Sequence, residues 1–423
     1  MLFDITQYNQ YILFFTFILF TGAGMYLFRS KYISIIDPLT LHIIWIASHL
    51  SFLSGYMYRY GIGILPAFFF INMLLYAYFY KLFLRNNKVV LSPYSPTSDN
   101  KSFKPGKIKL IFVLLIFINL YSKSSFFQYV IENPNIATWF LYRFIDMQGR
   151  DPLLRILSGS SSVFLIFYAF FLFTVIRKWR YFVVISYAMI VLLDVFAGGR
   201  SILVSIIFNF GLGFFYFREY FKISEINRFT KKGLIFSGAA LVAAIVVTSF
   251  YDSNYSISDG LSIVTNRFLA AGDGLEYYMN YDGLHKIKTG LEQYVYSIFG
   301  IYLKRFTGVN YKNIGLQLSE LVLGDLEFTQ GSNYTFLLQI MVIGYQFFLI
   351  YIPVIAYCTA KLRTIKFNSQ MLFPLSFFLS ATSFLLPEDI EYWFLTTVSG
   401  LLLFYVLIYP INKFSFTKPK RVQ

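Results

Sequence analysis

Long apolar runs separated by short polar segments dominate the pattern along the chain. About eleven runs approach the ~20 residues that an α-helix needs to cross the ~30 Å hydrocarbon layer of a membrane. The runs are continuous rather than alternating, which argues against a membrane β-barrel. The pattern therefore predicts an all-α polytopic membrane protein. The predicted spans are 11–28, 39–58, 62–80, 110–121 (short, and lengthened if it runs on through 122–130), 157–176, 181–197, 202–217, 233–250, 334–360, 372–386 and 393–409.

The composition supports a membrane protein. The mean hydropathy is +0.59, and 57% of the 423 residues are hydrophobic. The N-terminus lacks the basic region and small-residue cleavage site of a signal peptide, so we interpret 11–28 as the first span. Residues 1–423 are predicted to form a single integral membrane domain. The one cysteine, Cys358, lies within a predicted span and excludes an intrachain disulfide.

The net charge of +15 raises the possibility of a nucleic-acid partner, but the distribution of charge argues against it. With eleven spans, one face receives the segments 29–38, 81–109, 177–180, 218–232, 361–370 and the C-terminal tail. These hold 24 of the 36 Lys and Arg residues and only four acids. This is the positive-inside bias of a bacterial inner-membrane protein. It places the C-terminus in the cytoplasm and the N-terminus in the periplasm.

Two long segments fall on the outer face, 122–156 and 251–332. Loops of this length are usually functional or disordered. The second is rich in apolar and aromatic residues, so we expect a large helical periplasmic loop. Its stretch 290–304 is amphipathic at helical spacing, which predicts either an interfacial or re-entrant helix on the bundle or the wall of a groove for a lipid-linked substrate. The apolar side consists of Leu291, Tyr294, Val295, Ile298 and Tyr302.

The stretch DVFAGGRS (194–201) joins the sixth and seventh predicted spans. Gly198 and Gly199 permit a tight turn, after which Arg200 lies at a helix N-terminus. A guanidinium beside free backbone N–H groups is a good site for phosphate. The alternatives are an Asp194–Arg200 ion pair, or an Arg200 side chain that reaches the lipid headgroups.

The stretch NRFLAAGDGLEYY (266–278) places three charged residues together in the long loop. Arg267 is a second candidate for binding phosphate, and beside the carboxylates it is also a candidate catalytic residue. Asp273 lies between two glycines and Glu276 follows three residues later, so either carboxylate is a candidate general base. The alternative is that these residues form local salt bridges on a solvent-exposed loop, which contribute little to stability. Farther along, YLKRFTG (302–308) supplies Arg305 as a third phosphate-binding candidate.

Other polar residues carry weaker signals. His285 is the one histidine in an outer loop, where a surface position is the simpler interpretation. His42 and His49 share a helix face, which favours polar contacts inside the bundle over a metal site. The turn PEDIEY (387–392) presents three acids between the last two spans. Metal, nucleotide and serine-hydrolase motifs are absent from the sequence, so we expect no metal and no cofactor.

As a whole, the chain resembles the Wzy-type O-antigen polymerases, also called oligosaccharide repeat-unit polymerases. The resemblance covers nearly the whole chain, with its basic cytoplasmic face and one dominant late outer loop. It is carried by DVFAGGRS (194–201), NRFLAAGDGLEYY (266–278), YLKRFTG (302–308) and GSNYTFLLQIMVIG (331–344).

The resemblance implies a GT-C-like polymerase/ligase architecture and glycosyl transfer at the periplasmic face. The growing glycan would pass from undecaprenyl diphosphate to a new lipid-linked repeat unit. Arg200, Arg267 and Arg305 would hold the diphosphate, and a chain-length regulator is an expected partner. An O-antigen ligase, a flippase for the same lipid-linked unit and a non-catalytic receptor remain the alternatives.

Overall fold

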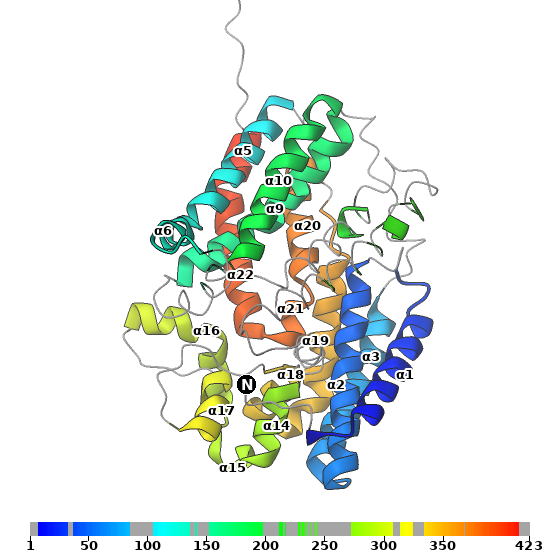
Figure 1. The fold of residues 1–423 in the computed structure, drawn as a ribbon. Coiled ribbons are helices and arrows are strands. Elements are labelled where there is room, and N and C mark those ends of the chain that lie inside the picture. The colour runs from blue at the N-terminus through cyan, green and yellow to red at the C-terminus, as the bar shows by residue number, and fades with distance from the viewer. Residues whose placement is uncertain are drawn as a thin grey trace, which may run out of the picture.

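The computed structural model describes residues 7–32, 37–84, 105–135, 139, 142, 152–197, 272–307, 314–324, 334–367 and 369–413, with scattered positions between 211 and 242. Every regular element in these parts of the chain is a helix, so the expected all-α class is confirmed for them. The helices form two packed groups with separate buried cores. Figure 1 shows one group at the upper left and the other at the lower right.

The first group is built around α1 (Gln10–Leu27), α2 (Pro38–Tyr60), α3 (Ile64–Phe83) and α19 (Phe348–Arg363). Asn9 caps α1 by accepting bonds from the backbone N–H groups of residues 11 and 12, and Asp37 caps α2. The outward face of α1 is strongly apolar, with Tyr11 89% and Phe15 67% exposed. An apolar face on this scale is typical of contact with lipid.

The second group consists of α5 (Pro105–Tyr121), α9 (Pro152–Val175), α10 (Arg180–Phe196), α20 (Phe373–Thr382) and α22 (Ile390–Leu403). Stacked rings hold its centre together, with the centroids of Phe164 and Phe378 separated by 4.8 Å. Gly400 lets α22 pack closely against Phe378 of α20, because a Cβ at position 400 would lie 2.0 Å from the Phe378 ring. The chain then continues through a π-helical turn, η7 (Phe404–Ile408), into α23 (Tyr409–Lys413).

Within the described residues, five helical segments are long and apolar enough to cross a membrane: Gln10–Leu27, Ile64–Phe83, Leu157–Thr174, Tyr345–Arg363 and Ile390–Lys413. A sixth arises if α5 is combined with α6 (Ser124–Glu132), which follows it at a 45° bend. The fourth predicted span thus corresponds to α5, and its possible extension through 122–130 is a separate helix, α6, that follows a bend. Helices α2 and α10 coincide with two more predicted spans, while most of 202–217 and 233–250 lies outside the described residues.

The prediction of one continuous span at 334–360 is wrong. The chain forms a short helix, α18 (Phe336–Ile343), and then breaks at Gly344 before η5 (Tyr345–Phe347) and α19. Gly344 has φ +126°, which a residue with a side chain rarely adopts. A hydropathy window does not register such a break, because α18 is itself fully apolar apart from Gln339.

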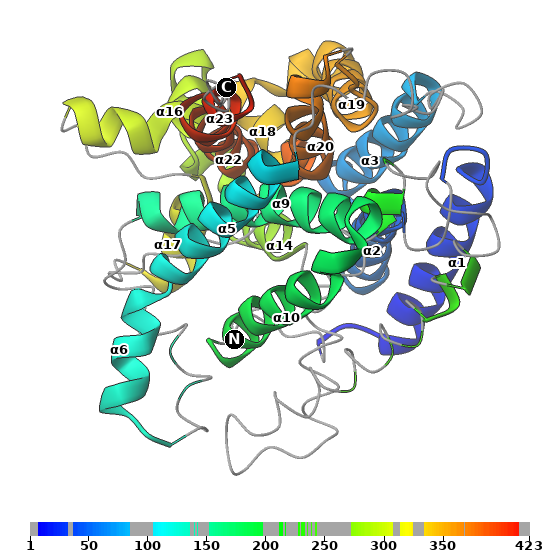
Figure 2. The ribbon, with the colours of Figure 1, turned by 90° about the horizontal axis from the view of Figure 1, so that it is seen from above.

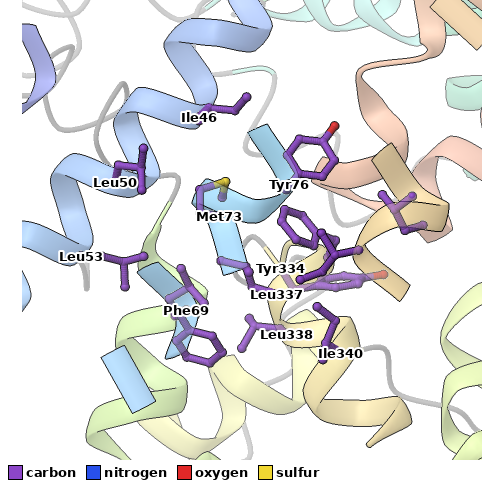
Figure 3. Close-up of a cluster of buried hydrophobic side chains, with 14 of the residues drawn as sticks. Ile46, Leu50, Leu53, Phe69, Met73, Tyr76, Tyr334, Leu337, Leu338 and Ile340 are labelled. Atoms are coloured by element: carbon purple, nitrogen blue, oxygen red, sulfur yellow. The ribbon is translucent and has the colours of Figure 1, made fainter. Parts of the chain in front are cut away.

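Helix α18 lies deep inside the first group. Figure 3 shows Leu337, Leu338 and Ile340 of α18 among side chains from α2 and α3, including Leu53 and Met73. The predicted span 372–386 is also divided, into α20 and α21 (Leu385–Glu388). At about 1.5 Å per residue, neither α18 nor α20 alone crosses a ~30 Å hydrocarbon layer.

Long-range polar contacts join segments that the charge pattern assigns to the same side of the membrane. On the basic side, Arg363 forms a buried ion pair with Asp37, and Lys107 donates to the backbone carbonyl of Asn412 over 2.6 Å. On the opposite side, Lys123 forms an ion pair with Asp194. These contacts agree with the predicted sidedness of the loops relative to one another.

Candidate functional site

Helix α14 (Asp273–Asn280) places the predicted acidic residues against the end of α2. Gly272 precedes α14 and lets the chain approach α2 closely, because a Cβ at position 272 would lie 2.4 Å from the Phe52 ring. At the other end of α14, Tyr56 Oη donates to Asn280 Oδ1 over 2.6 Å. The helix is thus anchored at both ends on α2, and it carries the second half of the NRFLAAGDGLEYY stretch.

Glu276 is buried on this helix, with 7% of its surface exposed. Tyr8, in the segment before α1, donates its hydroxyl hydrogen to Glu276 Oε1 over 2.5 Å. The Tyr8 ring packs edge-on against Phe52, with centroids 5.8 Å apart. Burial, followed by the bond to Glu276, raises the pKa of Tyr8 well above its ordinary value. Tyr8 therefore remains a hydrogen donor to the carboxylate throughout the physiological range.

Arg59 brings a positive charge to the same place. It lies in the last turn of α2, where its guanidinium stands 5.4 Å from the Tyr8 ring centroid and 4.8 Å from that of Tyr60. Its Nη1 donates to Gln7 Oε1 over 3.1 Å. Arg59 is exposed, so its charge is available to an anion at this surface. Arg59 is not among the residues predicted from the sequence, although the triplet Tyr58-Arg59-Tyr60 at the outer end of the second predicted span is typical of a membrane interface.

Asp273 has different surroundings from Glu276. It begins α14 and is only partly buried, and its Oδ1 accepts a hydrogen bond from the backbone N–H of Gly274 over 2.7 Å. The N-terminus of a helix favours a negative charge. Of the two predicted carboxylates, Asp273 is thus the more accessible and Glu276 the more firmly held.

The predicted arginines are not brought into this arrangement by the described part of the chain. Arg200 and Arg267 lie outside the described residues. Arg305 lies in α16 (Leu291–Thr307), in a stretch where the structure describes the backbone alone. Asp194, the other charged residue of the DVFAGGRS stretch, forms its ion pair with Lys123 at the α5–α6 bend.

The acidic turn 387–392 forms a second polar cluster. Asp389 caps α22 by accepting from the backbone N–H of Tyr392 over 2.8 Å. Glu391 is buried and accepts a 2.9 Å hydrogen bond from the hydroxyl of Tyr334, which belongs to the GSNYTF stretch. Burial, followed by the charge of Asp389, raises the pKa of Glu388 to about 7. At least one carboxyl of this turn therefore titrates near neutral pH.

The acidic turn and α14 share one buried apolar cluster. Leu386 precedes the turn and Ile390 lies within it, while Leu275 and Tyr277 come from α14, and all four belong to the core of the first helix group. Figure 1 shows α18 between α14, at the lower end of the molecule, and α21, near its middle. The two carboxylate groups are therefore supported by the same packed core.

The histidines play no evident part in this site. His285 is exposed and its Nδ1 lies 2.6 Å from Asp282 Oδ1, as the prediction of a surface position requires. His42 Nε2 lies 2.8 Å from Tyr76 Oη, and His49 Nδ1 lies 2.9 Å from the Trp45 carbonyl, which confirms polar contacts inside the bundle. Within the described ranges, no three His, Cys, Asp or Glu side chains come together as a metal site.

Comparisons with known proteins do not assign the chain. No family model, no curated protein sequence and no solved structure matches it. The geometry is therefore the main observation: Asp273 and Glu276 of α14 lie with the Tyr8 hydroxyl and the exposed Arg59 at the end of α2, and a second carboxylate cluster lies at the start of α22. Such a set can hold an anionic group at Arg59 and accept a proton at a nearby carboxylate.

Proposed function

We propose that this protein is a surface-polysaccharide polymerase of the O-antigen type, acting at the periplasmic face of a bacterial inner membrane. Its substrates would be oligosaccharide repeat units linked to undecaprenyl diphosphate. The single observation that carries the proposal is the cluster of Arg59, Tyr8, Glu276 and Asp273. Its four residues come from three separate segments, and Asp273 and Glu276 lie in a stretch that resembles this family. The resemblance of 194–201, 302–308 and 331–344 supports the same function.

The chemistry would be a glycosyl transfer. A hydroxyl of the incoming repeat unit forms the new bond to the anomeric carbon of the growing glycan, and the bond from that carbon to the diphosphate breaks. The electron pair leaves with the diphosphate, whose charge guanidinium groups stabilise. The acceptor hydroxyl loses its proton to a carboxylate. The long lipid and the glycan supply the binding energy that holds the two reactants together.

We assign the proton acceptor to Asp273, because it is the more accessible carboxylate, with Glu276 as the residue that organises the surrounding groups. Arg200, Arg267 and Arg305 keep their proposed role at the diphosphate, and Arg59 joins them. The acidic turn at 387–392 borders the same core, and we place it beside the acceptor glycan. A chain-length regulator is the proposed protein partner.

The proposal is tested in a deletion strain complemented with single-site variants. We expect loss of the gene to leave single repeat units attached to lipid A-core, visible on a gel of extracted lipopolysaccharide. Arg59→Ala and Asp273→Ala should yield the same single-unit product at normal membrane levels. Glu292→Ala, an exposed acid on α16, is the matched control and should restore the full ladder.

Two other outcomes would overturn the proposal. If the deletion strain carries no attached repeat unit at all, the protein acts as a ligase or a flippase. If both variants restore the full ladder, the cluster around Arg59 is not the active site.

A further inference from the structure

The apolar side chains of α16 extend from its buried side onto its exposed side. One face packs inward, where Tyr294 and Ile298 join the first core and Ser297 is fully buried. At about 100° per residue, positions 291, 295 and 299 lie on the side opposite Ser297, next to the exposed Glu292. They are Leu291, Val295 and Phe299, which are 67%, 42% and 37% exposed. The predicted single apolar side at 290–304 is thus divided between two surroundings.

A helix on the surface of a water-soluble loop needs only one apolar face, the one that contacts the protein. A second apolar face indicates a second apolar medium. Two features identify that medium. Lys286 and Lys288 stand exposed immediately before α16, in the arrangement of basic residues beside an apolar stripe that is typical of helices at a lipid surface.

The second feature is continuity with a membrane-spanning surface. Phe299 packs edge-on against Phe394 of α22, with ring centroids 4.7 Å apart. Phe394 is the fifth residue of the candidate span Ile390–Lys413, and so lies about 6 Å from its end. Interfacial helices bury their apolar faces to a depth of ~5–10 Å. The contact therefore places α16 at the depth where headgroups meet hydrocarbon.

A second helix, α6, also exposes apolar side chains beside polar ones. Helix α6, which bends away from α5, exposes Phe127 and Ile131 on one side and Gln128 and Glu132 on the adjacent side. It comes from the other long segment that the charge pattern assigns to the outer face. Figures 1 and 2 show α6 and α16 projecting from the same flank of the molecule.

We propose that α16 lies in the outer leaflet of the bilayer, with Leu291, Val295 and Phe299 inserted among the lipid chains and the basic segment 286–288 at the headgroup phosphates. Helix α6 lies at the same interface. The two helices form a lipid-contact surface on one flank of the molecule. This surface does not depend on the reaction that the protein catalyses.

Site-directed spin labelling of the full chain in anionic phospholipid vesicles tests the proposal. Cys358 is replaced by Ala, and single cysteines are introduced at 295, at 131 and, as the wet control, at the exposed Thr289. Accessibility to oxygen, which concentrates in hydrocarbon, is compared with accessibility to a water-soluble nickel complex. We expect the oxygen-to-nickel ratio at 295 and at 131 to exceed that at 289 several-fold.

Two results would overturn the proposal. High nickel accessibility at 295 would mean that the stripe faces water. Low accessibility to both reagents would mean that protein covers it, from this chain, a second copy or another partner. If labelling at 295 prevents folding, the same comparison at 291 decides between these outcomes, and the measurement at 131 remains an independent test of the interface.

Discussion

Asp273 and Glu276 are separated by less than one helical turn, yet their surroundings give them different roles. Glu276 is buried and bonded to Tyr8, whereas Asp273 is partly exposed at the start of α14. Because Tyr8 lies before α1, the Tyr8–Glu276 bond also links the N-terminal segment to a helix more than 260 positions away in the sequence. The arrangement of the cluster therefore depends on the position of the N-terminal segment as well as on that of α14.

Replacing Tyr8 with Phe removes the donor and leaves the Glu276 carboxylate with one hydrogen bond fewer. A hydrogen bond to a charged group contributes about 1.5–3 kcal/mol. We therefore expect Tyr8→Phe to lower the melting temperature of the purified protein and to reduce polymer formation in cells. Tyr11→Phe, at a position 89% exposed, is the matched control and should change neither. Unchanged stability of Tyr8→Phe would show that the bond has no energetic weight.

Glu388 provides a prediction about pH. Its pKa is raised from 4.5 to about 7, mainly by burial. Between these values the folded protein binds more protons than the unfolded chain, so the contribution of Glu388 to stability falls as pH rises through this range. We expect Glu388→Gln to melt at a higher temperature than the wild type at pH 8, with a difference that shrinks as the pH falls towards 4.5.

The matched control for this titration is Glu292→Gln, an exposed acid on α16. Its difference from the wild type, measured at the same pH values, shows how the loss of an exposed carboxyl changes the melting temperature. A Glu388→Gln effect that is equal at pH 5 and pH 8 would contradict the raised pKa.

At the residue scale, the sequence predicted the two carboxylates of α14 as candidates but did not predict their contacts. Asp273 and Glu276 could be selected because acids are rare in this chain and cluster there. Arg59 was missed because its role depends on contact with Tyr8, 51 positions earlier, and no local pattern records such a contact.

At the element scale, the positions where helices break were harder to predict from the sequence than the lengths of the helices. Continuous apolar runs predicted α1, α3 and α9 well, because each of these helices is uninterrupted. The same criterion failed at 334–360, since the break depends on the backbone conformation of Gly344 and on the burial of α18 from all sides. The position of this break is therefore determined by tertiary packing around α18.

We expect Gly344→Ala to destabilise the protein, because the φ of +126° strains any residue with a Cβ by about 1–3 kcal/mol. Thermal unfolding followed by size-exclusion chromatography measures the effect. Gly22→Ala is the control, since it lies within α1 with open space around it and should be neutral or slightly stabilising. Equal melting temperatures for Gly344→Ala and the wild type would show that the break tolerates a side chain.

At the scale of the whole molecule, the charge pattern and the long-range contacts support the same division into two sides. The buried Arg363–Asp37 pair joins two segments of the predicted cytoplasmic face, and the Lys123–Asp194 pair joins two of the outer face. The sidedness itself is a prediction from the sequence, because basic loops orient membrane proteins. It could not predict the division into two helix groups, which results from packing.

Sidedness has its own test in a variant whose Cys358 is replaced by Ala. Single cysteines at Ser30 and Thr289, both exposed, lie on opposite predicted sides. In spheroplasts, a membrane-impermeant maleimide should label position 289 and not position 30, while both should react after permeabilisation. The reverse pattern would invert the proposed topology and place the Arg59 cluster in the cytoplasm.

The most direct test of the proposed function is reconstitution of the purified protein in lipid vesicles with repeat units linked to undecaprenyl diphosphate. We predict that the wild type forms lipid-linked glycans of two or more repeat units and releases undecaprenyl diphosphate, and that Asp273→Ala does neither. The Glu292→Ala control, purified in the same way, should remain folded and active, which shows that the purification itself does not remove the activity. If the folded wild-type protein leaves the single units unchanged, or only moves them across the membrane, the polymerase account is contradicted.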